Sequence, residues 1–161
     1  MKTVEEQNRA VANDLLNTAM SYARRVLRLY GEISPFAFSL KADGSVTRET
    51  LDRPRLPSNP ASLWKLLHQH LASRAQQGKI RATAAGANVS LAHPSEEGYT
   101  DGIVFQIERE GGYAVKVTVA YRIYGGRFWN FIPRRVALGQ VTMEEITATI
   151  FTSQAQPATL H

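Results

Sequence analysis

Cysteine is absent from the 161 residues of the chain. This absence excludes disulfide scaffolds, cysteine nucleophiles and thiolate metal sites. Long apolar runs are also absent: no stretch reaches the roughly 18 residues that a membrane-spanning helix needs. The first residues, MKTVEEQNRAVANDLL, place two glutamates where a secretory signal needs positive charge and an apolar core. We therefore expect a soluble protein of the cytoplasm.

Motifs for common catalytic and cofactor sites are missing too. The chain contains no GxxxxGK[ST] or GxGxxG phosphate loop, no GxSxG nucleophile turn and no HExxH metal motif. His68 and His70 stand two residues apart, whereas neighbours on one helix face are three or four apart. The sequence therefore predicts no cofactor and no metal site.

The composition is typical of one globular domain, because 43% of the residues are hydrophobic and only 20% are charged. No internal repeat divides the chain. We expect a single domain over residues 1–152 and a flexible tail over residues 153–161, where SQAQPATLH has no periodicity. Three prolines in the sequence DRPRLPSNP predict a loop over Asp52–Pro60.

Two helices are predicted from apolar residues that recur every three or four positions. The first spans about Asn8–Leu29 and ends before Gly31. The second begins at Pro60 after the capping residue Asn59, and it ends before Gly78. The apolar face of the first helix consists of Val11, Leu15, Ala19, Tyr22, Val26 and Leu29.

Alternating apolar and polar residues predict strands between and after these helices. Ser34–Leu40 and Ser45–Leu51 are expected to form a hairpin around the turn at Asp43–Gly44. The other predicted strands are Lys79–Ala92 with a bulge at Gly86, Ile103–Glu108, Tyr113–Ile123 and a short last strand at Ile146–Ile150. The predicted fold is α+β, an antiparallel sheet of about five to six strands with two helices packed on one face.

The whole chain has a net charge of +5, and two of its basic stretches contain no acidic residue. Six basic residues and no acid lie between Arg53 and Ser95. The second stretch, YRIYGGRFWNFIPRR over Tyr121–Arg135, combines four arginines with five aromatic residues. Three interpretations stay open: a core plug under solvated arginines, a protein interface, or a nucleic-acid surface. The candidate binding residues are Arg122, Arg127, Trp129, Arg134 and Arg135.

Glu108 is the candidate catalytic residue if the protein is an enzyme. Alternation places Glu108 and Glu110 on one face of a strand end, roughly 6.5–7 Å apart, where two carboxylates can share acid/base work. Tyr121 or Arg122 would then orient a ligand in a pocket between helices and sheet. The alternative is a solvated strand end in which Lys116 or Arg122 pairs with these acids.

Two segments carry a resemblance to known proteins. Tyr30–Gly44 (YGEISPFAFSLKADG) and Asp101–Ala114 (DGIVFQIEREGGYA) resemble a pattern found in small uncharacterised bacterial proteins. In that pattern a helix leads into a G-E/K-x-x-P-F-A segment with an Asp-Gly turn, and a later strand ends in a glutamate-rich turn. The family has no known activity, so the resemblance implies an intracellular bacterial α+β protein and assigns no catalytic residue.

The sequence thus favours a non-enzymatic binding protein that acts through its aromatic and arginine residues. Its partner is expected to be another protein or a second copy of the chain, as in immunity proteins, inhibitors and accessory subunits, an analogy that rests on fold class. The first alternative is a small-molecule enzyme or sensor that uses Glu108. The second is weak nucleic-acid binding, whose affinity falls steeply with salt.

Overall fold

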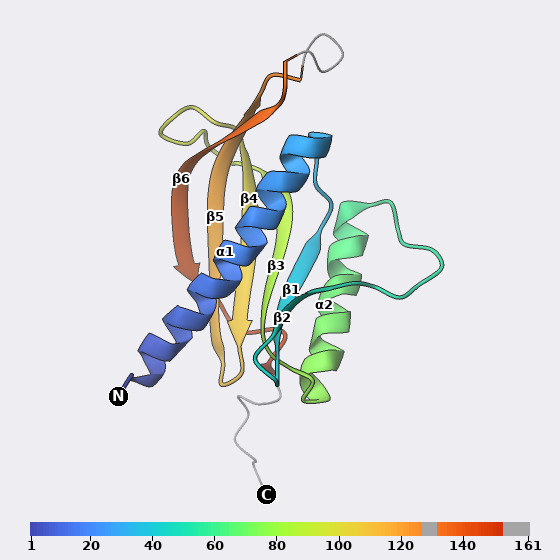
Figure 1. Cartoon of the computed structure of the whole chain (residues 1–161), viewed down its shortest axis with the longest axis vertical. Helices are drawn as coiled ribbons and strands as arrows, with labels where there is room; N and C mark the ends of the chain where they lie inside the picture. Colours follow the sequence, from blue (N-terminus) through green and yellow to red (C-terminus); the bar gives the residue numbers. More distant parts are fainter. Residues whose placement is uncertain (127–131, 153–161) are drawn as a thin grey trace, which may run out of the picture.

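The computed structural model describes residues 1–126 and 132–152. Its elements are α1 (Val4–Tyr30), β1 (Phe36–Lys41), β2 (Val46–Glu49), α2 (Pro60–Gln76), β3 (Ile80–Ser90), β4 (Asp101–Arg109), β5 (Tyr113–Tyr124) and β6 (Arg135–Glu145) (Figure 1). Neighbouring strands are antiparallel, in the order β2-β1-β3-β4-β5-β6. The predicted α+β class and antiparallel sheet are confirmed. Over the described ranges, neither helix has an apolar stretch long enough to cross a membrane.

Local signals at the helix ends explain where both helices begin and stop. The Thr3 side chain accepts a hydrogen bond from the Glu6 amide, and the Glu6 side chain accepts one from the Thr3 amide. This capping box starts α1 four residues earlier than the apolar pattern predicts. Gly31 ends α1 with a φ of 76°. At α2 the predicted start is confirmed, because Asn59 caps the helix and Pro60 opens it.

The larger core lies between α1 and one face of the sheet. Buried residues of α1 pack against Phe36 and Phe38 of β1 and against Phe105 of β4. The Tyr22 ring lies 4.9 Å from the Phe36 ring. The contributing buried residues of α1 are Ala12, Leu15, Ala19, Ala23 and Leu27. Ile103 and Ile107 of β4 and Val115, Val117 and Val119 of β5 lie in the same core. The alternation predicted for Ser34–Leu40, Ile103–Glu108 and Tyr113–Ile123 is therefore confirmed.

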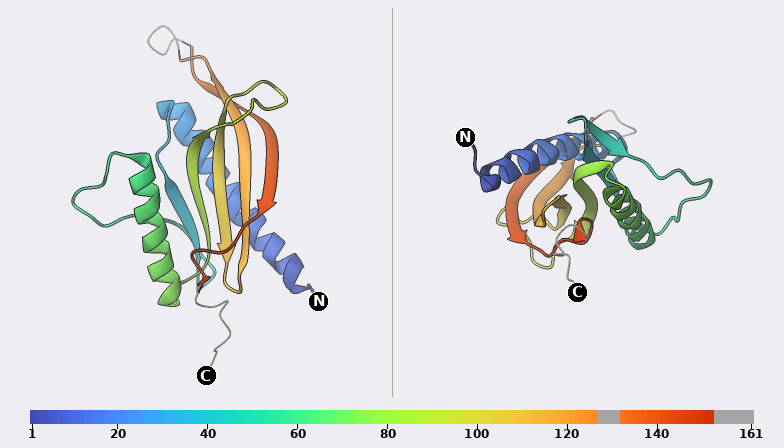
Figure 2. Two further views of the ribbon diagram at one scale, coloured as in Figure 1. Left: turned by 180° about the vertical axis from the view of Figure 1, so that it is seen from behind. Right: turned by 90° about the horizontal axis from the view of Figure 1, so that it is seen from below.

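Helix α2 packs on the opposite face of the sheet, which corrects the expectation that both helices share one face. Phe36 and Phe38 point to α1, whereas Ala37 between them packs with Leu67 and Leu71 of α2. Successive residues of a strand point to opposite faces, so the two helices cover different faces, as Figure 2 shows. On the α2 side, β1 and β3 carry small buried residues, and their short side chains let α2 approach: Ala37, Ser39, Thr83 and Ala85.

The last strand also differs from the prediction. Strand β6 spans Arg135–Glu145, and Ile146–Ile150 is not a strand. Between Val119 and Tyr121 the β5–β6 register shifts by one residue, because β6 carries a bulge near Gly139 that breaks its alternating pattern. After β6 the chain crosses the α2 side of the sheet (Figure 2), where Ile150 is buried in the smaller core. Gly86, predicted as a bulge, lies in regular pairing opposite Phe36.

Candidate functional site

Five arginines line a cleft of about 770 Å³ between the last turns of α1 and the start of β6. We call it the arginine cleft. Its lining residues are Ser21, Arg24, Arg25, Arg28, Tyr124, Arg134, Arg135, Val136 and Ala137. No acidic residue is among them, so the described part of the cleft has strongly positive potential. Such a field attracts anionic groups, and the planar guanidinium binds carboxylate or phosphate in two-point contacts.

Helix geometry and sheet topology bring these arginines together. Arg24, Arg25 and Arg28 follow Ser21 at spacings of three, four and seven residues, which places them on one face of α1. The start of β6 lies beside this face, and it adds Arg135 and the preceding Arg134. Arg134 and Arg135 are among the predicted binding residues, whereas the three arginines of α1 are not. Their common helical face is the signal that could have found them.

Arg134 is the most firmly held residue of the cleft. Its Nη1 donates a hydrogen bond of 3.0 Å to the carbonyl oxygen of Leu29, in the last turn of α1. Gly31 and Gly126 flank its side chain: a Cβ on Gly126 would lie 2.8 Å from Arg134 Cγ, and a Cβ on Gly31 would lie 3.1 Å from Nε. The two glycines form a slot that orients Arg134.

The other predicted binding residues are distributed differently. Arg122 of β5 lies outside the cleft lining, and its guanidinium stacks over the Tyr124 ring at 5.0 Å from the centroid. Tyr124 itself lines the cleft, so Arg122 extends the arginine surface along β5. Arg127 and Trp129 lie outside the described residues. The structure therefore brings together Arg134, Arg135 and, through Tyr124, Arg122.

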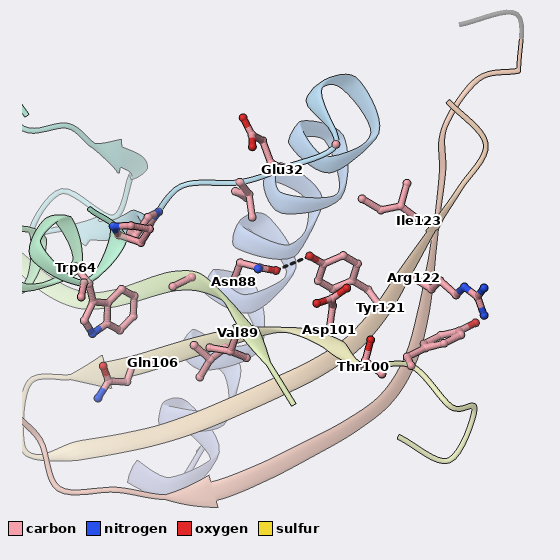
Figure 3. Close-up of a pocket in the computed structure, with 18 of the residues that line it drawn as sticks. Glu32, Trp64, Asn88, Val89, Thr100, Asp101, Gln106, Tyr121, Arg122 and Ile123 are labelled. Atoms are coloured by element: carbon pink, nitrogen blue, oxygen red, sulfur yellow. Dashed lines mark hydrogen bonds between the residues drawn. The ribbon is translucent and has the colours of Figure 1, made fainter. Parts of the chain in front are cut away.

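A second concavity, of about 1280 Å³, lies beside the end of β3 (Figure 3). We call it the β3 groove. Its walls come from the loop after α1, the first turn of α2, and the ends of β3, β4 and β5. Its lining includes charged, polar and apolar side chains: Glu32, Pro35, Trp64, Asn88, Val89, Asp101, Tyr121 and Arg122. The predicted pocket residues Tyr121 and Arg122 do line this groove, whereas Glu108 does not.

Tyr121 is a buried titratable group of the β3 groove whose pKa is strongly raised. It is only 5% exposed, and its hydroxyl donates a hydrogen bond to Asn88 Oδ1. Burial, and to a lesser extent the negative charge of nearby Asp101, raises the pKa of Tyr121 to about 12. The phenol therefore stays neutral throughout the physiological range and acts as a fixed hydrogen-bond donor.

This raised pKa predicts how stability changes in alkali. An unfolded tyrosine has a pKa near 10, so the folded state holds the Tyr121 proton more tightly. The resulting stabilisation is complete below pH ~10 and is lost as the pH rises towards ~12. A phenolate absorbance titration of the protein and of Tyr121→Phe should isolate this group. We expect Asp101→Asn to lower its pKa; an unchanged value would contradict the assigned role of the carboxylate.

Glu108 is a buried anchor for the chain after β6. It is 0% exposed, and its carboxyl oxygens accept three hydrogen bonds from Thr149 and Ile150. The backbone amides donate at 2.9 Å and 2.8 Å, and the Thr149 hydroxyl donates at 3.0 Å. Neither Lys116 nor Arg122 pairs with it, in contrast to the solvated alternative. Glu110, its predicted partner, lies beyond β4 with its Oε1 3.9 Å from Arg81 Nε.

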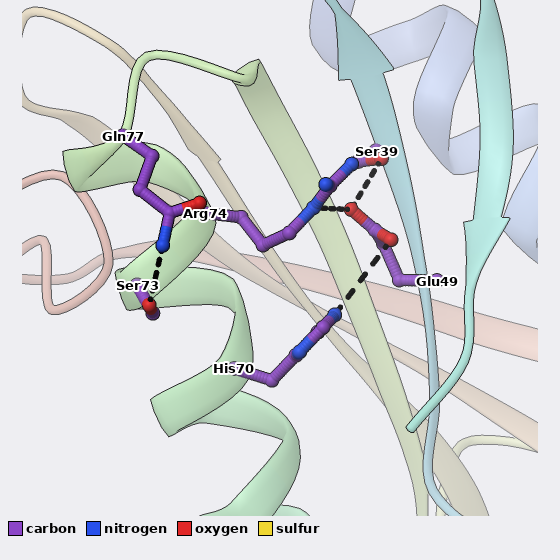
Figure 4. Close-up of polar contacts among 6 residues, drawn as sticks. All are labelled: Ser39, Glu49, His70, Ser73, Arg74 and Gln77. Carbon is purple, nitrogen blue, oxygen red and sulfur yellow. Dashed lines mark hydrogen bonds and ion pairs between the residues drawn. The ribbon is translucent and has the colours of Figure 1, made fainter. Parts of the chain in front are cut away.

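Figure 4 shows a second polar cluster, between α2 and the β1–β2 hairpin. Glu49 Oε1 accepts hydrogen bonds from Arg74 Nε at 3.0 Å and from Ser39 Oγ at 3.1 Å. His70 Nε2 lies 3.8 Å from the other carboxylate oxygen. Because Ser39 donates to Glu49 and not to His70, this is no nucleophile–base arrangement. The cluster attaches α2 to the sheet.

Comparison with protein families, curated proteins and solved structures finds no match to this chain. Among residues 1–126 and 132–152, no three histidine, aspartate or glutamate side chains are placed to hold a metal ion. The arginine cleft, which five arginines and no acid line, is the main candidate site.

Proposed function

We propose that the protein is a non-enzymatic binding module whose arginine cleft docks an acidic segment of another protein. The observation that supports this most is the set of five arginines, without an acid, around one cleft. Three of them are solvent-exposed on α1, so an incoming carboxylate reaches them without displacing structure. Arginine is enriched at protein interfaces and gives two-point contacts with carboxylates.

The surroundings of the cleft favour a protein over a nucleic acid. Nucleic-acid phosphates continue at close intervals, so a strand held in the cleft would extend onto neighbouring surfaces. Gly31, which contacts Arg134, also lines the β3 groove, and that groove carries the carboxylates of Glu32 and Asp101. Those acids would repel a continuing phosphate backbone, whereas a protein segment can limit its acids to the cleft.

The biological setting follows from this type of binding. We propose an inhibitor, immunity or accessory protein of a bacterial cytoplasm, which covers its partner by steric fit and electrostatic attraction. A second copy of the chain is the alternative partner. Its exposed Glu145, at the far end of β6, is the acid that would enter the cleft of the first copy.

Charge reversal in the cleft tests this proposal. The probe is a fluorescein-labelled peptide of ten glutamates, and binding is followed by fluorescence anisotropy. In the double variant Arg24→Glu/Arg28→Glu, each reversal replaces an attraction by a repulsion, about 1.4 kcal/mol or tenfold in Kd. We expect the peptide to bind about a hundredfold more weakly.

The matched control is Arg53→Glu/Arg55→Glu, which makes the same change in net charge at two exposed loop residues away from the cleft. Its affinity should change less than about threefold at 0.15 M salt, where charges act over roughly 8 Å. Equal losses in both double variants would contradict a localised site. If a twelve-base-pair DNA duplex bound more tightly than the glutamate peptide, with an affinity that falls steeply with salt, the ligand of the cleft would be nucleic acid and not protein.

A further inference from the structure

Strand β3 has an edge that its neighbours leave partly open. On one side it pairs with β4 as far as Ser90 and Asp101. On the other side the pairing with β1 ends at Phe36 and Gly86. Residues 87–90 thus have no strand partner on the β1 side within the described structure. Pro35 precedes β1 and lacks an N–H group, so the chain before β1 cannot continue the ladder through that residue.

The β3 groove lies along this open edge. Its opposite wall is the loop that carries Glu32 and Pro35, and Trp64 lies at its α2 end (Figure 3). Its volume of about 1280 Å³ exceeds the roughly 300–1,000 Å³ of usual small-molecule pockets. A groove of this size beside a free strand edge suits an extended peptide, which pairs its main chain with such an edge.

The two faces of the sheet give the groove different chemistry. Alternation places Asn88, Asp101 and Tyr121 on the α1 side of the strands. It places Val89 on the α2 side, where Trp64 also lines the groove. A strand added beside β3 would therefore present alternate side chains to a polar site and to an apolar one.

Charge decides which polar side chain fits. Of the two basic groups of the groove, Lys116 is paired, because its Nζ lies 2.7 Å from Glu144 Oε1, whereas Arg122 stacks on Tyr124 and keeps its charge. The carboxylates of Glu32 and Asp101 have no ion-pair or hydrogen-bond partner within the described residues, and both residues are exposed. Two carboxylates against the one guanidinium of Arg122 leave the groove with a net negative charge, so it complements a basic side chain.

We propose that the β3 groove binds an extended peptide that adds a strand beside residues 87–90 and alternates basic with apolar side chains. The basic side chains lie towards Asp101 and Glu32, and the apolar ones lie against Val89 and Trp64. This site is separate from the arginine cleft and takes ligands of the opposite charge.

The test compares short capped peptides by fluorescence anisotropy. The probe is labelled Val-Lys-Val-Lys-Val, and its counterpart is Val-Glu-Val-Glu-Val. We expect the lysine peptide to bind at least about tenfold more tightly. The double variant Glu32→Gln/Asp101→Asn should weaken its binding about tenfold and remove the preference for lysine. The variant Arg24→Glu/Arg28→Glu should bind it unchanged, which separates this site from the arginine cleft.

Main-chain pairing is tested by N-methylation. In an added strand only alternate amides face β3, so methylating one alternate set should abolish binding and methylating the other should not. Equal effects of both sets would overturn strand addition. If n-butylamine displaced the lysine peptide completely at a concentration equal to that of the peptide, the groove would bind small cations, and the proposal of a peptide ligand would be overturned. Failure of both peptides to bind at 1 mM would also overturn it.

Discussion

Replacing Glu108 with alanine is expected to lower the free energy of unfolding by about 3–4 kcal/mol. The substitution removes three hydrogen bonds and leaves the amides of Thr149 and Ile150 without their acceptor. Each buried amide without a partner costs about 1–3 kcal/mol, and the lost side-chain volume adds a cavity. Ile150 and Phe151, which this anchor holds in the smaller core, should loosen together. Urea unfolding measures the change in free energy.

Glu108→Gln is the matched control, because glutamine keeps the shape and one carbonyl oxygen for the two amides. We expect it to cost less than half as much as alanine. Hydrogen exchange locates the effect: the amides of Thr149 and Ile150 should lose protection before those of β4. A loss below about 1 kcal/mol in the alanine variant, with protection intact, would show that the anchor contributes little.

Most elements of this fold could be predicted because their signals are local. Apolar spacing, the cap at Asn59 with Pro60, and the Asp43–Gly44 turn all act within a few residues. The side of α2 could not be predicted in this way. Ala37 and Ala85 are small enough to suit either an exposed or a buried face, and only the presence of α2 above them decides.

Strand β6 was missed for a related reason. Val136 and Leu138 alternate on one side of the bulge, and Val141 and Met143 alternate on the other, but the extra residue shifts their phase. Over the whole segment the period of two disappears. The alternating pattern then favours Ile146–Ile150, whose last residue is indeed buried, although through Glu108 and not through strand pairing.

The candidate site, too, could be predicted only in part from the sequence. Arg134 and Arg135 stand out in sequence because aromatic residues surround them and acids are absent. Arg24, Arg25 and Arg28 stand about 100 residues away, on the polar face of an ordinary amphipathic helix. Only the packing of α1 along the sheet joins the two groups. For Glu108 the sequence is misleading. Its position at a strand end predicts a solvent-exposed side chain, but the chain after β6 packs over it and buries it.

Gly86 illustrates a requirement that no sequence pattern reveals, and it carries the second large prediction. Gly86 pairs with Phe36, and a Cβ at position 86 would overlap the Phe36 ring, lying 2.7 Å from its Cε1 and closer still to its Cζ. That ring packs among Tyr22, Phe38 and Phe105, which restrict its movement away from position 86. Gly86→Ala is therefore expected to lower the free energy of unfolding by about 2–3 kcal/mol, as overpacking does.

Shortening the ring should restore part of this loss. Phe36→Leu alone leaves a cavity and costs about 1–2 kcal/mol, but combined with Gly86→Ala it removes the overlap. The two effects should then fall short of additivity by at least about 1 kcal/mol in a double-mutant cycle measured by urea unfolding. Additive losses in this pair would mean that the ring is not the obstacle and that glycine serves the strand in another way.

Gly44→Ala separates steric overlap from backbone strain. Gly44 has a φ of 91°, and a Cβ added to it would meet no atom within 4 Å. An alanine there is strained by its backbone conformation alone, so the substitution should cost only about 1 kcal/mol. Because no ring opposes this position, Phe36→Leu should not rescue it. A rescue of Gly44→Ala as large as that of Gly86→Ala would show that the shorter side chain stabilises the fold generally, and not by relieving the overlap at Gly86.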